Sequence, residues 1–451
     1  MHYTPHTDSD REEMLRRIGV RGIEELLVDI PASLRNTEFS LPEGMSEHEL
    51  LKHMTVLASA NRPLSELTSF LGAGAYEHLI PAAVEYLLAR PEFSTCYTPY
   101  QPEASQGTLT ALFEYQTMIC RLTGMPVANA SLYDGASACA EAAILALRAQ
   151  GKNRVALARS LNPFYARTVA TYLKGLGTEI VEIPYTEGGQ VDTGCLADIA
   201  GTVSCVIVQS PNFFGVIEDM KAIGEIIHDT DALFVASVNP VSLGVLAPPG
   251  ECGADIAVGD VQVFGNTLSF GGPYAGFFAV AAALMRKIPG RVCGMTQDRE
   301  GRRGFVLTLQ TREQHIRREK ATSNICTNEA LCTLASCVYL SLLGRQGIEE
   351  LARLNVQKAH YACEVLSAID GVTPYFSGPF FNEFVITLDS AIPLDALEER
   401  MLKQGILPGL RLGRFFSDLE RCLLVCVTEA RTREEIDRFA AALKQILKEN
   451  L

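Results

Sequence analysis

Seven short apolar runs, alternating with polar segments of helical spacing, constrain the fold of this chain more than any other feature. We expect strands at residues 154–158, 179–183, 204–208, 233–236, 255–258, 261–264 and 277–280. Strands that alternate with helices in this way predict right-handed βαβ units and a mostly parallel sheet buried on both faces. The sequence therefore predicts a large doubly wound α/β domain, with ligand chemistry at the carboxyl ends of its strands.

The flanking regions have other patterns and predict two further domains. We expect helices at 10–18, 47–61, 108–122, 136–150, 331–343 and 348–369, and strands at 383–388 and 422–427. A capping box from Thr432 to Glu435 predicts the start of a final helix. The predicted domains are a helical N-terminal arm (1–95), the large α/β domain (96–330) and a small C-terminal α+β domain (331–451).

The composition excludes several classes of protein. The 451 residues are 47% hydrophobic and carry a net charge of −14, which argues against disorder and against nucleic acid as the main partner. The apolar stretch 274–285 is shorter than the roughly 20 residues of a bilayer span, and the first ten residues lack a signal-peptide pattern. We expect a cytoplasmic protein that does not enter a membrane.

The cysteines and histidines do not form a metal-binding pattern. The 13 cysteines are scattered, no pair has Cys-x-x-Cys spacing, and the eight histidines are equally dispersed. We therefore expect free, mostly buried thiols and no metal site.

Residues 97–107 place reactive side chains in a stiffened loop. Tyr97, Tyr100, Gln101 and Ser105 supply phenols, an amide and a hydroxyl, and two prolines restrict the backbone between them. A merely solvated loop rarely combines these features, so we favour a functional role.

Small residues precede the helix expected at 136–150. Gly135, Ala136 and Ser137 could present backbone N–H groups and a hydroxyl to an anion. An ordinary N-cap at Asp134 is the alternative, and the motif alone favours it.

The densest polar block is 312–324, and it has two interpretations. It is either a salt-bridged helical face, with Glu313 and Arg317 paired at i,i+4, or a cationic surface, including Arg312 and Arg317, for an acidic partner or a carboxylate.

The chain lacks the lysine that a pyridoxal phosphate enzyme needs for its Schiff base. No lysine lies between Lys221 and Lys287, a span that covers the strand ends where such a lysine would stand. Residues 233–239 offer no carboxylate for the pyridine nitrogen. We therefore expect that this chain alone does not hold pyridoxal phosphate covalently.

Five segments together resemble the P-protein of the glycine cleavage system, a pyridoxal phosphate enzyme of fold type I. The segments are 72–78, 97–107, 134–141, 266–276 and 310–327. The resemblance covers essentially the whole chain and implies the α half of an enzyme with two similar halves, in which the β half carries the lysine. It places Asn266 at the lost lysine position and Ala236 at the lost position of the pyridine-facing aspartate.

The activity implied by the resemblance belongs to a complex. In an α2β2 assembly, glycine would be decarboxylated on pyridoxal phosphate bound covalently by the β subunit, and the aminomethyl group would pass to the lipoyl group of H-protein. Our candidates for residues lent to the β active site are Tyr97, Tyr100, Gln101 and Ser105.

Other roles of the chain stay open. Arg312 and Arg317 are weaker candidates, for a contact with acidic H-protein. A non-catalytic scaffold needed only for assembly is the main alternative function. A stand-alone pyridoxal phosphate decarboxylase would need an imine at an unexpected lysine such as Lys287 or Lys320.

Overall fold

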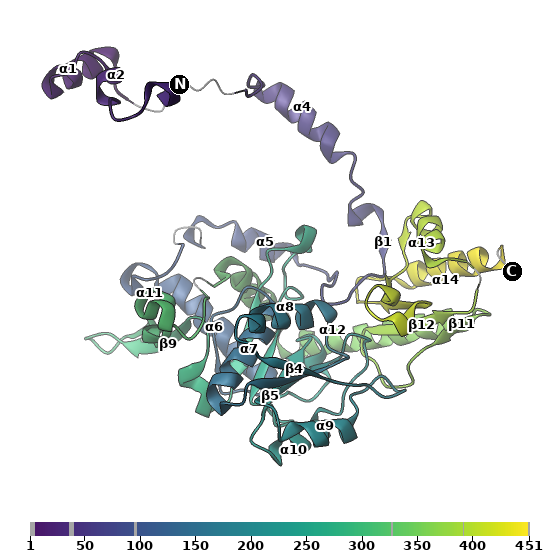
Figure 1. Ribbon diagram of the computed structural model, residues 1–451. Coiled ribbons are helices and arrows are strands. Elements are labelled where there is room, and N and C mark those ends of the chain that lie inside the picture. Colours follow the sequence, from purple (N-terminus) through teal and green to yellow (C-terminus); the bar gives the residue numbers. More distant parts are fainter. Residues whose placement is uncertain (1–4, 36–39, 94–96, 326–327, 391, 450–451) are drawn as a thin grey trace. The chain divides into compact units, whose positions relative to one another are not determined.

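The computed structural model describes residues 5–35, 40–93, 97–325, 328–390 and 392–449. The chain divides into two compact units, Met1–Pro63 and Leu64–Leu451 (Figure 1). Among the described residues, every strand belongs to the second unit.

The first unit consists of helices whose apolar side chains are mostly exposed. Its helices are α1 (Asp8–Ile18), α2 (Ile23–Leu26), α3 (Ala32–Arg35) and α4 (Glu47–Ala58). Capping boxes at Thr7 and Ser46 begin α1 and α4, because each side chain accepts a bond from a backbone N–H of the first turn. No residue of these four helices is buried.

The compact body begins at Leu64, earlier than the predicted end of the arm at residue 95. Strand β1 (Thr68–Ser69) pairs in parallel with β13 (Ile406–Leu407), and α5 (Ala82–Leu88) buries Val84. The pattern of the sequence misses this boundary because a two-residue strand has no measurable periodicity.

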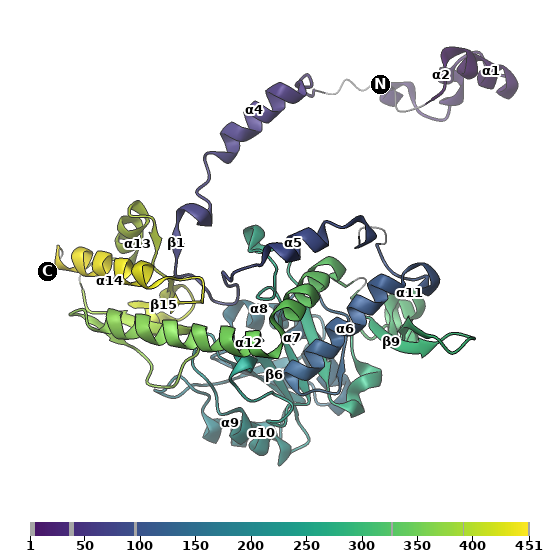
Figure 2. The same cartoon turned by 180° about the vertical axis from the view of Figure 1, so that it is seen from behind.

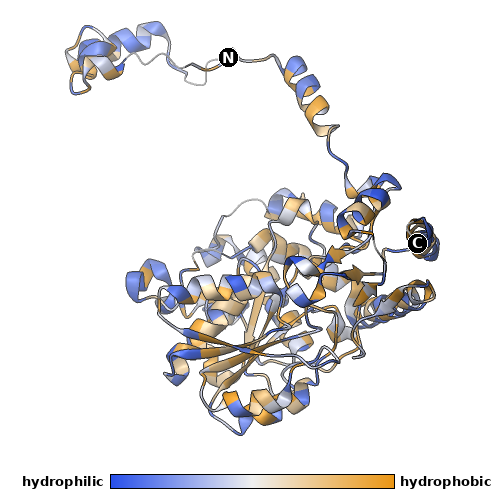
Figure 3. Cartoon of the chain, turned by 45° about the vertical axis from the view of Figure 1, so that its right-hand side comes forward, coloured by the Kyte–Doolittle hydropathy of each residue, from blue (hydrophilic) through white to orange (hydrophobic). Residues whose placement is uncertain are grey.

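A seven-stranded sheet forms the centre of the second unit, in the order β2-β8-β7-β6-β5-β3-β4. Its strands are β2 (Val127–Ala128), β3 (Arg154–Ala158), β4 (Glu179–Ile183), β5 (Cys205–Ser210), β6 (Leu233–Val238), β7 (Ile256–Asp260) and β8 (Gly276–Val280). Only the pairings of β8 are antiparallel. The apolar character of these strands is visible in Figure 3. The prediction of a mostly parallel sheet is confirmed.

One predicted strand, 261–264, is wrong. These residues form a turn after β7, in which the Phe264 N–H donates to the Val261 carbonyl. Val261, Val263 and Phe264 are apolar because they are buried in the core, and not because the backbone is extended.

Helices cover both faces of the sheet, as the doubly wound prediction requires. They are α6 (Gln106–Thr123), α7 (Gly135–Gln150), α8 (Pro163–Lys174), α9 (Thr193–Ala200), α10 (Met220–His228) and α12 (Ala330–Ser367). One core cluster joins the sheet to α7 and α8, and the other joins it to α6, α9, α10 and α12. Successive residues Val235 and Ala236 of β6 belong to opposite clusters, which is the alternation expected of a strand buried on both faces.

The long helix α12 connects the large sheet to a smaller one (Figure 2). It is interrupted at Gly344, whose φ is 59°, so the two helices predicted at 331–343 and 348–369 are both present. By length and composition alone α12 could cross a membrane, but 50% of its apolar window is buried in the protein, which is typical of a core helix.

The smaller sheet has its own core and the order β11-β12-β15-β14. Its elements are β11 (Val372–Pro374), β12 (Glu383–Leu388), α13 (Leu394–Lys403), β14 (Leu410–Arg411), β15 (Cys422–Cys426) and α14 (Arg433–Lys448). The predicted capping box at Thr432 begins α14. Because α12 packs in both cores, the predicted boundary after residue 330 stays a prediction.

An antiparallel hairpin completes the fold. Strands β9 (Val292–Gln297) and β10 (Arg303–Thr308) pack on α6, and the one-turn helix α11 (Gln314–Arg317) follows them. The hairpin carries Arg291 at its start, next to the polar segments singled out in the sequence.

Candidate functional site

A buried arginine joins the stiffened loop to the hairpin. Arg291 is only 2% exposed. Its Nη2 donates to the Tyr100 hydroxyl at 2.9 Å, and its Nη1 donates to Thr98 Oγ1 at 3.4 Å. The guanidinium also lies 5.2 Å from the centre of the Tyr100 ring, a cation–π distance. Arg291 therefore fixes the position of the loop.

Residues of the polar block 312–324 lie against the same arginine from the other side. The carboxylate of buried Glu313 lies 3.6 Å from Arg291 Nε, and the His315 ring lies edge-on to Tyr100 at 5.8 Å. The i,i+4 pair of Glu313 with Arg317, one of the two interpretations of this block, is not found among the described residues: the Glu313 carboxylate lies beside Arg291, and Arg317 Nε donates to the Thr311 carbonyl. The two polar segments of the sequence therefore meet at Arg291, a residue that no local sequence pattern indicated.

The structure separates the four loop candidates. Tyr97 is 87% exposed, Tyr100 is 50% exposed, and Gln101 is also exposed, so all three can contact another molecule. Ser105 is buried at the start of α6. A buried hydroxyl cannot reach a partner's active site without a change of structure, so Ser105 is not a residue that this loop can lend.

The two arginine candidates also differ. Arg312 donates to the carbonyls of Leu309 and Gly290, at 3.0 and 3.1 Å, and burial lowers its pKa. Its guanidinium therefore connects two backbone segments and is not available for a contact with a partner. Arg317 is exposed, so it stays a candidate for a contact with an acidic partner.

The carboxyl ends of β6 and β7 enclose a cavity of about 30 Å³. Its lining includes Tyr76, Tyr165, Gln209, Ser237, Asn239, Asp260 and Val263. None of the described residues that line it is a lysine. The place where this fold would hold a ligand is therefore nearly filled by side chains.

The N-terminus of α7 beside this cavity is closed by the chain's own carboxylates. The Ser137 N–H donates to Asp134 Oδ1 at 2.7 Å, and the Gly135 N–H donates to Asp260 Oδ2 at 3.1 Å. Burial raises the pKa of Asp260 to about 7. The favoured interpretation, an N-cap at Asp134, is therefore present, and the possible anion site at Gly135, Ala136 and Ser137 has the N–H groups of Gly135 and Ser137 already bonded to carboxylates.

The two positions assigned by resemblance do not lie together in this cavity. Ala236 is fully buried in β6. The Asn266 side-chain N–H₂ turns toward α12, where it donates to Ser336 Oγ at 3.2 Å and to the Cys332 carbonyl at 3.3 Å. Without a lysine, a free helix N-terminus or sufficient volume, the cavity does not fit pyridoxal phosphate.

A second buried carboxylate ties the segment 72–78 to the small sheet. Glu383 accepts a bond from the Ala73 N–H at 2.6 Å and another from the Tyr76 hydroxyl at 2.7 Å. Burial raises the pKa of Glu383 to about 7. The Tyr76 N–H donates to Gln262 Oε1 at 2.9 Å, so this segment links the small sheet to the turn that follows β7. The sequence showed this segment only through its resemblance to the family.

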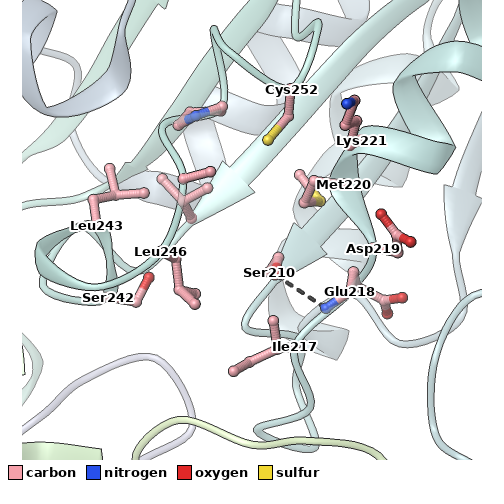
Figure 4. A pocket seen from close by; sticks show the side chains of 13 residues that line it. Ser210, Ile217, Glu218, Asp219, Met220, Lys221, Ser242, Leu243, Leu246 and Cys252 are labelled. Atoms are coloured by element: carbon pink, nitrogen blue, oxygen red, sulfur yellow. Dashed lines mark hydrogen bonds between the residues drawn. The ribbon is translucent and has the colours of Figure 1, made fainter. Parts of the chain in front are cut away.

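A larger hollow of about 200 Å³ lies beside β5 and α10 (Figure 4). Its walls are mostly apolar. At its edge, the Glu218 N–H donates a hydrogen bond to Ser210 Oγ. The hollow contains none of the predicted site residues, and its labelled lining is Ser210, Ile217, Glu218, Asp219, Met220, Lys221, Ser242, Leu243, Leu246 and Cys252.

The thiols and metal-ligand residues give no further site. None of the 11 described cysteines forms a disulfide, and burial raises the pKa of several, including Cys139 and Cys205 to about 12. In the described part of the chain no group of three His, Cys, Asp or Glu side chains could hold a metal ion. The expectation of no metal stays a prediction.

Known proteins resemble this chain over its full length. It is 52% identical over 448 residues to the probable glycine dehydrogenase (decarboxylating) subunit 1 of Desulfitobacterium hafniense, covering 99% of this chain and all of the relative. The corresponding protein of Moorella thermoacetica is also 52% identical, over 449 residues. The fold matches the crystal structure of an inhibitor-bound glycine decarboxylase (P-protein) with a TM-score of 0.90 and 43% identity, covering 99% of this chain and 100% of that one.

More distant structures share the fold alone. A sphingosine-1-phosphate lyase of Burkholderia pseudomallei matches 93% of this chain and 94% of that one, with a TM-score of 0.68 and 16% identity. The predicted pyridoxal phosphate fold type I is thereby confirmed. The family model of the glycine cleavage system P-protein matches residues 1–443. This chain therefore belongs to the glycine cleavage system P-protein family.

Proposed function

We propose that this chain is the α subunit of a two-chain glycine dehydrogenase (decarboxylating) and that its β subunit binds pyridoxal phosphate covalently. One observation carries the proposal: this P-protein fold has no lysine among the described residues that line its strand-end cavity, and the N–H groups at the start of α7 beside that cavity already donate to Asp134 and Asp260. Such a chain needs a second one to supply the cofactor site. The complex is cytoplasmic and contains two copies of each subunit.

The reaction of the complex is the decarboxylation of glycine with transfer of the aminomethyl group to lipoylated H-protein. When bound in the β subunit, pyridoxal phosphate supplies the electron sink for this chemistry. Our candidates in this chain are Tyr97, Tyr100 and Gln101, whose exposed phenols and amide can hydrogen-bond to a substrate and exclude water from it. Arg317 is a candidate contact for H-protein.

Reconstitution tests the proposal. The purified chain, its β subunit and H-protein should together release CO₂ from glycine, and omission of any one of the three should abolish this release. Activity of the β subunit with H-protein alone would contradict the proposal.

Substitutions in the loop distinguish a contributing subunit from a scaffold. Tyr97→Phe and Gln101→Ala should lower the turnover of a complex that still assembles, whereas Tyr375→Phe, a change at another exposed tyrosine directly after β11, should not. Unchanged turnover in both loop variants would favour the scaffold alternative, because the loop would then not reach the chemistry.

A further inference from the structure

A cationic groove lies on the same body as the loop, away from the closed cavity. Its volume is about 410 Å³, and it is formed by the last turns of α7, the 3₁₀ helix η6 (Ala282–Lys287) and residues 319–322. Its charged lining residues are Arg148, Arg286, Lys287, Glu319 and Lys320. The described lining of the groove thus contains four cationic side chains and one carboxylate.

Most of this positive charge is not neutralised within the chain. Arg286, Lys287 and Lys320 are exposed, and no ion pair among the described residues involves them. Arg148 differs, because its guanidinium donates to the carbonyls of Ala321 and Thr322 and so builds the wall of the groove. The remaining cations concentrate positive charge on a protein whose net charge is −14.

The groove is too far from the strand ends to take part in chemistry there. Gly135, at the cavity, and Arg148, at the groove, lie on the same helix, and a rise of 1.5 Å per residue separates them by about 20 Å. Charges at this distance act on association and not on bond making.

The segment that forms one wall of the groove also supports the loop. Residues 319–322 follow α11 in the chain, and the Thr322 N–H donates to the Arg312 carbonyl at 3.1 Å. Glu313, the residue after Arg312, pairs with Arg291. A molecule bound at the groove therefore contacts the segment that holds Tyr100 in place.

We propose that this groove docks a carboxylate-rich surface of the lipoylated carrier protein. The inference rests on the proposed function and names the surface that the carrier recognises. Exposed, spaced cations without a buried polar anchor suit the extended acidic surface of a protein better than a small anion, which needs converging donors. Lys287 and Lys320, considered above as possible Schiff-base lysines, are then docking residues.

Charge reversal in the reconstituted complex tests the proposal. The double variant Arg286→Glu/Lys287→Glu should raise the KM for H-protein about tenfold at low salt and leave kcat at saturating H-protein unchanged, because steering by a charged surface changes association rates by roughly 10-fold or more. The difference from wild type should shrink at about 0.5 M salt, where the screening length is only a few ångströms.

Two controls isolate the groove. Lys174→Glu/Lys444→Glu makes the same change in net charge on exposed residues of α8 and α14 and should leave the KM unchanged. Arg286→Lys/Lys287→Arg preserves the charge and should behave as wild type. With free lipoamide as the acceptor, the charge-reversed variant should also equal wild type.

The outcomes separate this inference from the proposed function. An unchanged KM for H-protein in the charge-reversed variant overturns the groove as a docking site. Failure of that variant to assemble with the β subunit also overturns it, since the groove would then be a subunit interface. A wild-type complex that does not decarboxylate glycine at all refutes the proposed function instead.

Discussion

Removal of the guanidinium of Arg291 should destabilise the protein strongly. Arg291→Met keeps an aliphatic chain of similar length but leaves the buried carboxylate of Glu313 without the Arg291 guanidinium, and His315 Nδ1 lies 3.7 Å from that carboxylate. Side-chain exposures of 2% and 6% mean that water cannot replace the lost partner. Breaking a buried pair from one side costs about 3–5 kcal/mol, a large part of the roughly 5–15 kcal/mol by which a folded protein is stable.

Three further variants separate the contributions to this loss of stability. Arg291→Met/Glu313→Leu removes both charges and should recover most of the stability, because no charge is left buried. Tyr100→Phe removes only the hydrogen bond from Arg291 and should cost about 1 kcal/mol. Arg302→Met, at an exposed ion pair with Asp298, should cost less than about 1 kcal/mol.

Urea unfolding followed by circular dichroism measures these differences as shifts of the midpoint. Limited proteolysis adds a local measurement, because Arg291→Met should also expose the loop at Tyr97 to cleavage. A single variant Arg291→Met as stable as Arg302→Met would refute the reasoning, since the pair would then not be desolvated.

Three further predictions concern the closed cavity. Burial raises the pKa of Glu383 from its usual 4.5 to about 7, so the folded state binds an extra proton and the free energy of unfolding should fall as pH rises between these values. Glu383→Gln, which mimics the protonated form, should reduce this slope in urea midpoints from pH 5 to 7.5, while Asp260, whose pKa burial also raises to about 7, still contributes to it. Gly135→Ala should destabilise the fold by about 1–3 kcal/mol in the same assay, because its methyl group overlaps with the Tyr165 hydroxyl. Asn266→Lys should not produce a pyridoxal phosphate adduct that borohydride fixes, because this side chain turns toward α12 and away from the cavity; mass spectrometry of the reduced protein measures the adduct.

Features with a local cause were predictable from the sequence. The strands at 154–158 and 179–183 are found at the predicted residues, because each is a short apolar run bounded by polar residues. The capping box at Thr432 is likewise a pattern of neighbouring residues. The turn at 261–264 was missed because burial alone makes a run apolar, whatever its backbone conformation.

Features that depend on distant residues were not predictable. Glu313 looked like the partner of Arg317, four residues away, but the fold brings Arg291 to it. The closure of α7 by Asp260 joins residues 125 positions apart. The Asn266 position rested on resemblance, and the direction of its side chain is set by α12, whose packing no local pattern shows.

The central claim, a subunit that cannot build its own cofactor site, is tested most directly by an absorbance scan. Pyridoxal phosphate is added to the purified chain, and the spectrum is recorded before and after borohydride reduction. We expect no band at about 410–430 nm, where an internal aldimine absorbs, and glycine decarboxylation once the β subunit and H-protein are added. A band that borohydride fixes to a lysine of this chain would mean that the chain builds its own cofactor site.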